Sequence, residues 1–560
     1  MAIAASPGAA LLFGALLALF LPAAWRALAM ALAALAALFL MFAPDFGEQV
    51  AIARTGIVVT PVQLDALSQV FGLAVTVVAL GLALFSAYRR DRAEDVAFMT
   101  QAGAALIAIF AGDLIFFAAA AQVCLLAGAV MTMRAPRGLA AGLSLLGWSG
   151  VAGVLIVAGA ALEWAQSGAL ALQPLDARTP GGALLLLGFL IMAAGPVAHV
   201  WLKAAAPRAS AVGAAALVAF PAAMALYALA RAFQGEPLLV WIGVVMALWP
   251  LPFAAAARDP RTAMAYGAVS QGGAVVAALG VATPLASAGA VAYGFVCVLH
   301  TALACMAVGF ACERAAAGIP VRGLARAMPI TAAMAIVAAL SALAAPGFAG
   351  FAARTLIADA VAHEQRAIVY WALAAANAGA VLHIGLRTPY DVFFAEEPGG
   401  RPQEKPFLTV LALSLLAFFC VAVGSDPGWL YGLLPASVFF HPYEAERLVA
   451  QGQIIFFAAL AWSLARRLKL SPSQDLPDAD RALAAAARWG TWAAAAGGAA
   501  LGLRAKRAVT AAWALALQAE RFLAARLGGG RESAVAGLWL LIAAAAMLII
   551  LFLAARQAGA

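Results

Sequence analysis

Residues 285–312 read LASAGAVAYGFVCVLHTALACMAVGFAC, and this stretch decides the class of fold. It contains no Asp, Glu, Lys or Arg, and it is longer than the roughly 20 apolar residues that cross a hydrocarbon core of about 30 Å. Apolar stretches of about 17–25 residues recur along the chain. Of its 560 residues, 66% are hydrophobic and 11% are charged. The sequence therefore predicts an all-α polytopic membrane protein with about 14–16 transmembrane helices.

The basic residues divide unevenly between the two sets of loops that alternating spans create. One set, which includes the loops at Arg90, Arg137 and Lys405, holds most of the Lys and Arg. The opposite set holds only Arg54, Arg178, Arg231, Arg354, Arg366 and Arg447. By the positive-inside rule, the first set of loops is cytoplasmic. The protein is therefore predicted to be integral to the cell (inner) membrane, with its amino terminus on the outer side. The net charge of +8 thus reports topology and not nucleic-acid binding.

Four segments are expected along the chain. Residues 1–95 hold the amino-terminal transmembrane helices, which begin at residues 11–21 without a cleaved leader. Residues 96–470 form a core with helix breaks at Pro196, Pro221 and Pro346-Gly347, a pattern typical of inverted repeats. Residues 471–532 form a cytoplasmic arm, either helices on the membrane face or a solvated helical hairpin. Residues 533–560 hold a last span.

No cofactor or metal site is predicted. The cysteines lie in or beside apolar spans, without a Cys-x-x-Cys pair or a histidine cluster, and are interpreted as small packing residues. They are Cys124, Cys297, Cys305, Cys312 and Cys420. No Gly-rich phosphate loop and no flavin motif is present.

Five polar landmarks occur in order along the core. They are Asp113-Leu114 at the head of an apolar run to Gln122, residues 195–202 (GPVAHVWL), residues 259–271 (DPRTAMAYGAVSQ), His300 and residues 345–351 (APGFAGF). This arrangement resembles the antiporter-like membrane subunits of respiratory complex I and of Mrp-type cation/proton antiporters, over roughly residues 60–470. Later stretches, GLRTPY at 385–390 and HPYE at 441–444, are most similar to the Mrp D subunit.

The resemblance also implies a proton relay, and this chain lacks its charged groups. In the family, a glutamate pairs with a lysine on a broken helix and passes protons to a central lysine. The glutamate position falls on Gln122, and the lysine positions fall on Met192, Ala223 and Ala304. No lysine occurs between Lys203 and Lys405. Glutamine cannot hold a proton near pH 7, and Ala and Met cannot relay one. The usual lysine relay is therefore predicted to be absent.

Two histidines remain as candidates for proton transfer. His300 matches a family histidine in mid-span, where it either carries protons or hydrogen-bonds for helix packing. His383 lies where a later helix is expected to break at Pro389. It is either a second-half relay or exit group, or an interfacial residue that caps the break.

Other polar residues have structural alternatives. Asp113 is expected to cap the following helix. Arg354 and Arg387 keep a positive charge that they cannot release, so they can hold an electrostatic field or a carboxylate. Tyr266, Ser270 and Gln271 either line a hydrated path or make ordinary interhelical hydrogen bonds.

Together these patterns predict a D-like subunit of a multi-subunit monovalent cation/proton antiporter. Its expected role is that of a weakly conducting or non-conducting paralogue that supports neighbouring membrane subunits. The alternative is an antiporter-like proton-translocating subunit of a redox-driven complex of the NADH dehydrogenase or hydrogenase type. A free-standing enzyme or carrier is a third class, but no catalytic constellation supports it, and the chain is not expected to be an enzyme by itself.

Overall fold

The computed structural model describes residues 6–43, 49–54, 57–315, 321–364, 366–395, 404, 407–436, 438–468 and 478. The chain divides into two compact units, Met1–Asp475 and Leu476–Ala560. The predicted arm (471–532) and last span (533–560) lie outside the described residues, except for Asp478. All the described helices and strands belong to the first unit.

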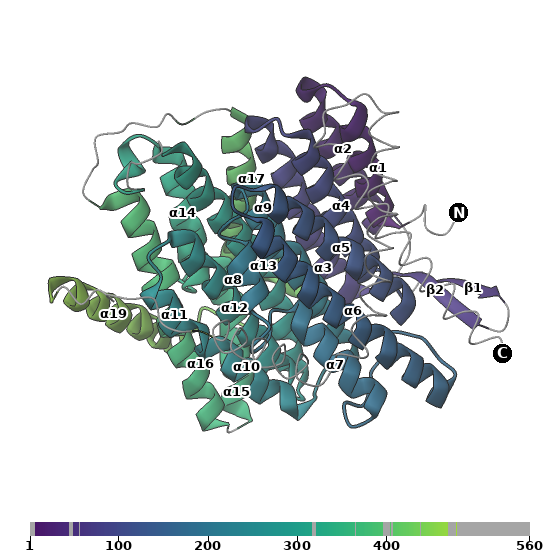
Figure 1. Cartoon of the computed structure of the whole chain (residues 1–560). Helices are drawn as coiled ribbons and strands as arrows, with labels where there is room; N and C mark the ends of the chain where they lie inside the picture. Colours follow the sequence, from purple (N-terminus) through teal and green to yellow (C-terminus); the bar gives the residue numbers. More distant parts are fainter. Residues whose placement is uncertain are drawn as a thin grey trace, which may run out of the picture. The chain divides into compact units, whose positions relative to one another are not determined.

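The first unit is a bundle of helices (Figure 1). In chain order the helices before the centre are α1 (Pro7–Phe20), α2 (Ala23–Phe42), α3 (Ala66–Phe85), α4 (Arg92–Ile109), α5 (Leu114–Arg134), α6 (Leu139–Ser167), α7 (Pro180–Met192), α8 (Val200–Ala205), α9 (Ala211–Ala232), α10 (Pro237–Leu248) and α11 (Pro250–Ala256). The later helices are α12 (Pro260–Leu279), α13 (Pro284–Arg314), α14 (Pro329–Ala342), α15 (Ala349–His363), α16 (Ala367–Ala380), α17 (Phe407–Ser425), α18 (Pro427–Tyr431) and α19 (Ala445–Arg467).

The all-α membrane class is confirmed. In the described part of the chain, eleven helical segments are long and apolar enough to cross a membrane, and α1, α7 and α14 are shorter apolar helices. One antiparallel hairpin, β1 (Gln49–Arg54) and β2 (Ile57–Gln63), lies between α2 and α3. The sequence analysis did not anticipate this hairpin.

The helices α9 and α13 are the most enclosed of the apolar helices described, with 94% of each span buried. Small residues let their backbones approach closely. A methyl group added at Gly309 of α13 would lie only 2.8 Å from the side chain of Ala211 at the start of α9. Thr283 caps α13 by accepting a hydrogen bond from the amide of Ala286, and Pro284 occupies its first turn. This enclosed helix carries His300 into the middle of the unit.

Two of the three predicted helix breaks are present, and they have the same backbone form. The chain leaves α7 and α14 through Ala194 (φ 55°) and Ala344 (φ 56°), both left-handed. The next amide closes a six-residue turn in each case, from Gly195 to the carbonyl of Leu190 (2.7 Å) and from Ala345 to that of Leu340 (2.9 Å). This is the Schellman pattern of helix termination.

The break expected at Pro221 is wrong. Pro221 lies inside α9, which continues from Ala211 to Ala232 as one α-helix. A proline removes one backbone hydrogen bond, and packed neighbouring helices in a membrane protein tolerate that loss. The side chain of Pro221 is itself buried, so its surroundings hold the helix on both sides of the ring.

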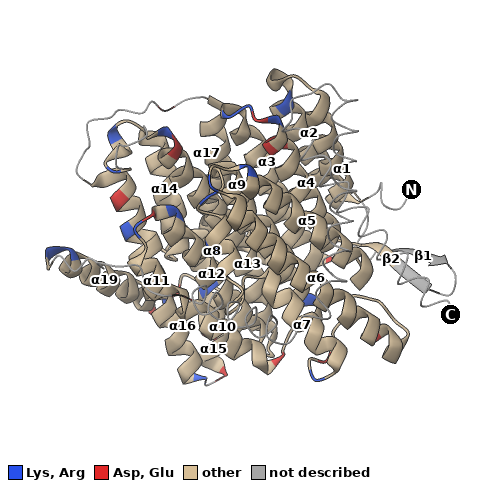
Figure 2. Ribbon diagram, viewed as in Figure 1, with Lys and Arg blue, Asp and Glu red and all other residues tan. Residues whose placement is uncertain are grey.

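Charged residues lie mostly toward the ends of the helices (Figure 2). Ion pairs join arginine-bearing loops of one predicted set: Arg26 with Asp95 (3.3 Å), Arg134 with Asp91 (3.4 Å) and Arg89 with Glu313 (3.0 Å). At the opposite end, Asp65 pairs with Arg231. The alternation of helices therefore separates these two sets of loops, and which end is cytoplasmic stays a prediction.

Candidate functional site

A buried polar cluster surrounds His300 in the middle of α13. The ring Nε2 of His300 makes a hydrogen bond with Oε1 of Gln271 on α12, and its Nδ1 lies 3.3 Å from the hydroxyl of Ser341 on α14. Tyr293, two turns earlier on α13, donates its hydroxyl proton to the same Gln271 oxygen over 3.4 Å. The structure thus joins two predicted residues, His300 and Gln271, by a direct contact.

Arg354 on α15 extends this cluster toward one end of the bundle. Its guanidinium lies 5.1 Å from the ring centre of Tyr293, a cation–π distance. Its Nη1 donates to Oδ1 of Asn377 on α16 over 2.8 Å, and the Asn377 amide donates to Oε1 of Gln451 on α19 over 2.9 Å. Gln451 in turn donates to the carbonyl of Leu343 at the second helix break (2.7 Å). Polar contacts therefore run from His300 to α19.

A cavity of about 190 Å³ opens beside Arg354, Asn377 and Gln451. These three side chains are buried, whereas other lining residues near the surface are partly or fully exposed. The outer lining includes Asp359 and Arg447, which pair over 3.4 Å. The cavity thus leads from the ends of α15 and α19 to the buried Arg354 guanidinium, with polar walls that can hold water.

The positions where the family's charged groups are replaced lie on four helices, α5, α7, α9 and α13. Gln122 on α5 accepts a hydrogen bond from Ser149 on α6 (2.9 Å), and its amide nitrogen has no partner among the described residues. Met192, Ala223 and Ala304 are buried at 1%, 0% and 6% exposure. Gln122 does not contact the His300 cluster through any hydrogen bond found among the described residues.

A small apolar cavity of about 20 Å³ lies beside Met192. Its walls include Trp201, Leu217, Leu226 and Val298, and its one hydroxyl is that of Thr301. An ordered water needs two to four polar partners. Among the described residues that line this cavity, only the Thr301 hydroxyl, the Cys297 thiol and the Trp201 indole are polar side-chain groups, so the cavity offers little to hold water.

The residues Tyr266 and Ser270 of α12 occupy different surroundings from Gln271. Ser270 donates to the carbonyl of Ala247 on α10 over 2.6 Å. This is an ordinary interhelical hydrogen bond, the alternative to lining a hydrated path. The ring of Tyr266 lies 6.2 Å from that of His199 and 6.0 Å from the ammonium of Lys203. His199, which is buried at 1% exposure, received no role in the sequence analysis.

The helix expected to break at Pro389 is instead continuous. Val381–Arg387 and Tyr390–Phe394 are π-helical, so the helical segment runs on from α16 to Phe394. A π-helical turn is wider than an α-turn, and it gives the proline ring room along the helix. His383 lies within the first π-helical stretch, and its Nδ1 is buried without a partner in the described part of the chain. It therefore does not cap a break.

Asp113 and Arg387 both bind backbone groups. Asp113 caps α5 by accepting from the amides of Ile115 and Phe116, and it also accepts from Thr60 of β2 over 2.8 Å. Arg387 donates to the carbonyls of Ala254 and Ala255 in the last turn of α11, and to that of Ala257 just after the helix over 2.9 Å. Positive charge at a helix carboxyl terminus is stabilising, so Arg387 fastens two helices.

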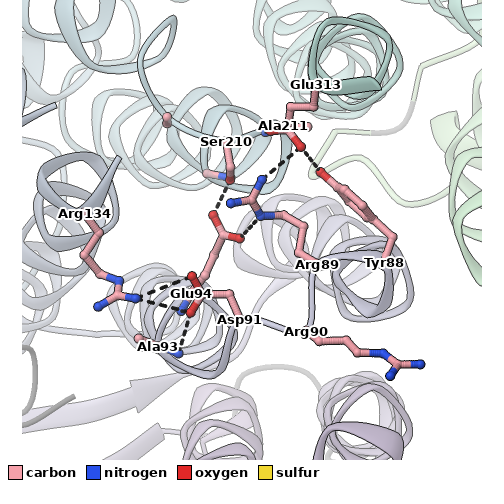
Figure 3. Close-up of polar contacts among 12 residues, drawn as sticks. Tyr88, Arg89, Arg90, Asp91, Ala93, Glu94, Arg134, Ser210, Ala211 and Glu313 are labelled. Atoms are coloured by element: carbon pink, nitrogen blue, oxygen red, sulfur yellow. Dashed lines mark hydrogen bonds and ion pairs between the residues drawn. The ribbon is translucent and has the colours of Figure 1, made fainter. Parts of the chain in front are cut away.

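A second charged cluster lies at the end of the bundle that carries Arg89 (Figure 3). Glu313 at the end of α13 accepts from the Tyr88 hydroxyl, from Arg89 (3.0 Å) and from the backbone amide of Ala211 (2.7 Å). Glu94 pairs with Arg89 over 2.7 Å. Burial alone would lower the pKa of Arg89, but the carboxylates of Glu94 and Glu313 hold this pKa above its usual range.

This cluster joins the corner between α3 and α4 to the amino terminus of α9. Ser210, the N-cap of α9, donates its hydroxyl proton to Glu94 and accepts from the amide of Gly213 (2.9 Å). Carboxylates near a helix amino terminus are favoured by the helix dipole. Arg89 cannot release its proton, so its charge stays available for these ion pairs. The cluster therefore holds α3, α4, α9 and α13 together.

No group of three or more metal-ligating side chains occurs among the residues that the structure describes. All five cysteines are free thiols, and four of them are buried.

Sequence reasoning missed four members of the polar route: Tyr293, Ser341, Asn377 and Gln451. Tyr293, Ser341 and Asn377 are polar side chains within largely apolar helical stretches, and that isolation is the signal that could have found them. Gln451 lies in α19, which carries other polar residues, so isolation does not mark it.

The family described as NADH:quinone oxidoreductase/Mrp antiporter, TM, matches residues 100–379. A search of curated proteins finds no match to this sequence. The fold is similar to a chain of the Mrp complex from Dietzia sp. DQ12-45-1b, with a TM-score of 0.76 and 21% identity over 93% of this chain. This chain spans 62% of the length of that Mrp chain.

Two other solved structures share the fold. A chain of respiratory complex I from Thermus thermophilus has a TM-score of 0.68 and 21% identity, over 82% of this chain and 99% of that one. A chain of the membrane-bound sulfane sulfur reductase, an archaeal respiratory membrane complex, has a TM-score of 0.70 and 20% identity, over 98% and 99%. Because the family match covers 280 of 560 residues, the protein belongs to the NADH:quinone oxidoreductase/Mrp antiporter transmembrane family.

Proposed function

We propose that this chain is a D-like subunit of a multi-subunit monovalent cation/proton antiporter, in which it supports its neighbours without carrying protons through a lysine relay. It resides in the cell (inner) membrane with its amino terminus outside. Its partners are other membrane subunits, and the transported species of the whole assembly are a monovalent cation and the proton.

The observation that carries the proposal is the apolar packing of the lost relay positions. Met192, Ala223 and Ala304 are all buried among apolar side chains. A proton that crosses a bilayer needs successive ionisable or hydroxyl groups, because an isolated charge at mid-membrane is costly. At the glutamate position, the Gln122 side chain accepts one hydrogen bond, from Ser149, among the described residues.

The scaffold of the family is nevertheless kept. Both helix breaks at Ala194 and Ala344 retain the same left-handed turn, and the fold is similar to that of a chain in an Mrp complex. The helix-break geometry is retained, whereas the glutamate and lysines of the relay are absent. This combination supports a role in assembly.

The alternative is an antiporter-like subunit of a redox-driven membrane complex. The match to the sulfane sulfur reductase chain favours it, because that match spans nearly the full length of both chains. In this second role, the polar route from His300 to Arg354 would be one segment of a proton path within the complex.

The test is purification of the tagged, full-length chain from its native membranes in mild detergent, with mass spectrometry of the copurifying subunits. Copurification with small Mrp-type subunits supports the first proposal, and copurification with quinone- or hydrogenase-type subunits supports the alternative. Isolation as a stable monomer that exchanges cations for protons by itself would overturn both.

A further inference from the structure

Arg354 is a buried cation without a carboxylate partner among the described residues. It is 8% exposed, and its contacts are the Asn377 carbonyl oxygen and the face of the Tyr293 ring. A buried charge is stable only when an opposite charge or several hydrogen bonds compensate it. One amide oxygen and one aromatic ring leave most of this charge uncompensated.

The neighbouring amides cannot supply further acceptors to Arg354. Asn377 uses its NH₂ group to donate to Gln451, and Gln451 uses its own NH₂ group to donate to the carbonyl of Leu343. These bonds fix both amides so that only Oδ1 of Asn377 faces the guanidinium. Arginine has five N–H donors, and one protein acceptor leaves the others directed toward Tyr293 and the cavity.

The cavity provides the room and an entrance. Its volume of about 190 Å³ is many times the roughly 10–15 Å³ that one water requires, so it can hold a small ion with part of its hydration shell. Arg354 lies at its buried end, and Glu446 lies at its exposed end. No carboxylate therefore reaches the guanidinium from the described inner walls.

Two of the other three charged residues that line the cavity, Asp359 and Arg447, are in ion pairs. Asp359 pairs with Arg447 (3.4 Å) and with His363 (3.5 Å), and Arg447 also pairs with Glu444 (2.8 Å). Those pairs lie toward the mouth, where their side chains are partly exposed. The fourth charged lining residue, Glu446, is exposed at the mouth. Arg354 is therefore the buried charge of this cavity that, among the described residues, no carboxylate contacts.

We propose that the buried end of this cavity binds one small monovalent anion, of the size of chloride, on the Arg354 guanidinium. The anion accepts hydrogen bonds from the free N–H groups of Arg354 and is held between α15, α16 and α19. This site requires only the described unit, so it does not depend on which complex the chain joins. It assigns Arg354 to fixed binding of a counterion rather than to proton release.

The experiment uses the purified full-length chain in mild detergent, in buffers of equal ionic strength that contain sodium chloride, sodium bromide or sodium gluconate. Gluconate is too large for the site, so the thermal unfolding midpoint should be higher in chloride and bromide, with a saturable dependence on halide concentration. Binding of radioactive chloride should also saturate. Equal midpoints in all three salts, together with no saturable chloride binding, would overturn the proposal.

Variants locate the anion. Arg354→Gln should weaken chloride binding by about tenfold or more, because charged hydrogen bonds to the anion are lost. Arg354→Lys keeps the charge and should retain a weaker site, which provides the test if Arg354→Gln does not fold. Arg178→Gln, an exposed matched control, should bind chloride as the parent does. Undiminished binding in a folded Arg354→Gln or Arg354→Lys protein would place the anion elsewhere and refute the assignment.

Discussion

Replacement of Gln122 by alanine separates a supporting subunit from a conducting one. The side chain accepts one hydrogen bond, from Ser149 over 2.9 Å, and its own NH₂ group is buried without a partner among the described residues. Loss of one interhelical hydrogen bond in a membrane protein costs about 0.6 kcal/mol on average. If all of this energy appeared in the transport barrier, the exchange rate would change by only about threefold.

Ser149→Ala is the matched control, because it removes the same hydrogen bond from the opposite helix. If Gln122 only packs, both variants should exchange cations for protons within about threefold of the parent complex. His300→Ala removes two contacts, to Gln271 and Ser341, and should reduce exchange by no more than about tenfold if His300 also only packs. Loss of an essential proton carrier would instead remove transport.

Exchange should be measured in inverted membrane vesicles, with the content of every subunit matched by immunoblot so that poor assembly is not mistaken for lost chemistry. Abolished exchange in a normally assembled Gln122→Ala complex, with Ser149→Ala active, would refute the non-conducting interpretation. It would show that protons cross this subunit through Gln122 without lysines. Abolished exchange in His300→Ala alone would confine conduction to the half that contains Arg354.

Three further predictions concern topology and stability. Reporter fusions at Arg137 should read as cytoplasmic and those at Asp176 as external, and a reversal at both would invert the assigned orientation. Glu313→Gln should lower stability by about 1 kcal/mol, because Arg89 is partly exposed and loses only one of its two carboxylates; an unchanged thermal midpoint would contradict this. Asp113→Ala should cost about 1 kcal/mol or somewhat more, seen as a comparable drop in the same midpoint, since three backbone amides lose their acceptor.

The sequence predicted the features of the fold that depend on local chemistry. Apolar length located the spans, and the Gly195-Pro196 and Pro346-Gly347 pairs located the two breaks, because proline and glycine end a helix wherever its surroundings allow. Pro221 and Pro389 have no glycine beside them, and no helix ends at either. Buried packing around Pro221 in α9 and a widened π-helical turn before Pro389 let each helix continue. Neither feature is visible in the sequence alone.

The candidate site was harder to predict because its contacts join distant helices. His300 and Gln271 were both singled out, but their direct bond depends on how α12 and α13 are rotated against each other. Asn377 and Gln451 are 74 positions apart and became visible only as a bonded pair. An isolated polar residue in an apolar helix indicates that the side chain has a hydrogen-bond or ion-pair partner. Only the tertiary structure identifies that partner.

The two halves of the core share their broken-helix geometry but differ in what surrounds it. Beside Ala194 the nearby cavity is small and apolar, whereas beside Ala344 it is large and lined by Arg354, Asn377 and Gln451. The same backbone turn therefore does not require titrating groups, since Schellman bonds satisfy its amides in both places. Charge could thus be lost from one half without loss of its fold, while Arg354, which cannot release its proton, keeps a fixed positive field in the other. A subunit built in this way can hold its shape within a complex while any ion movement it retains is confined to the half that remains polar.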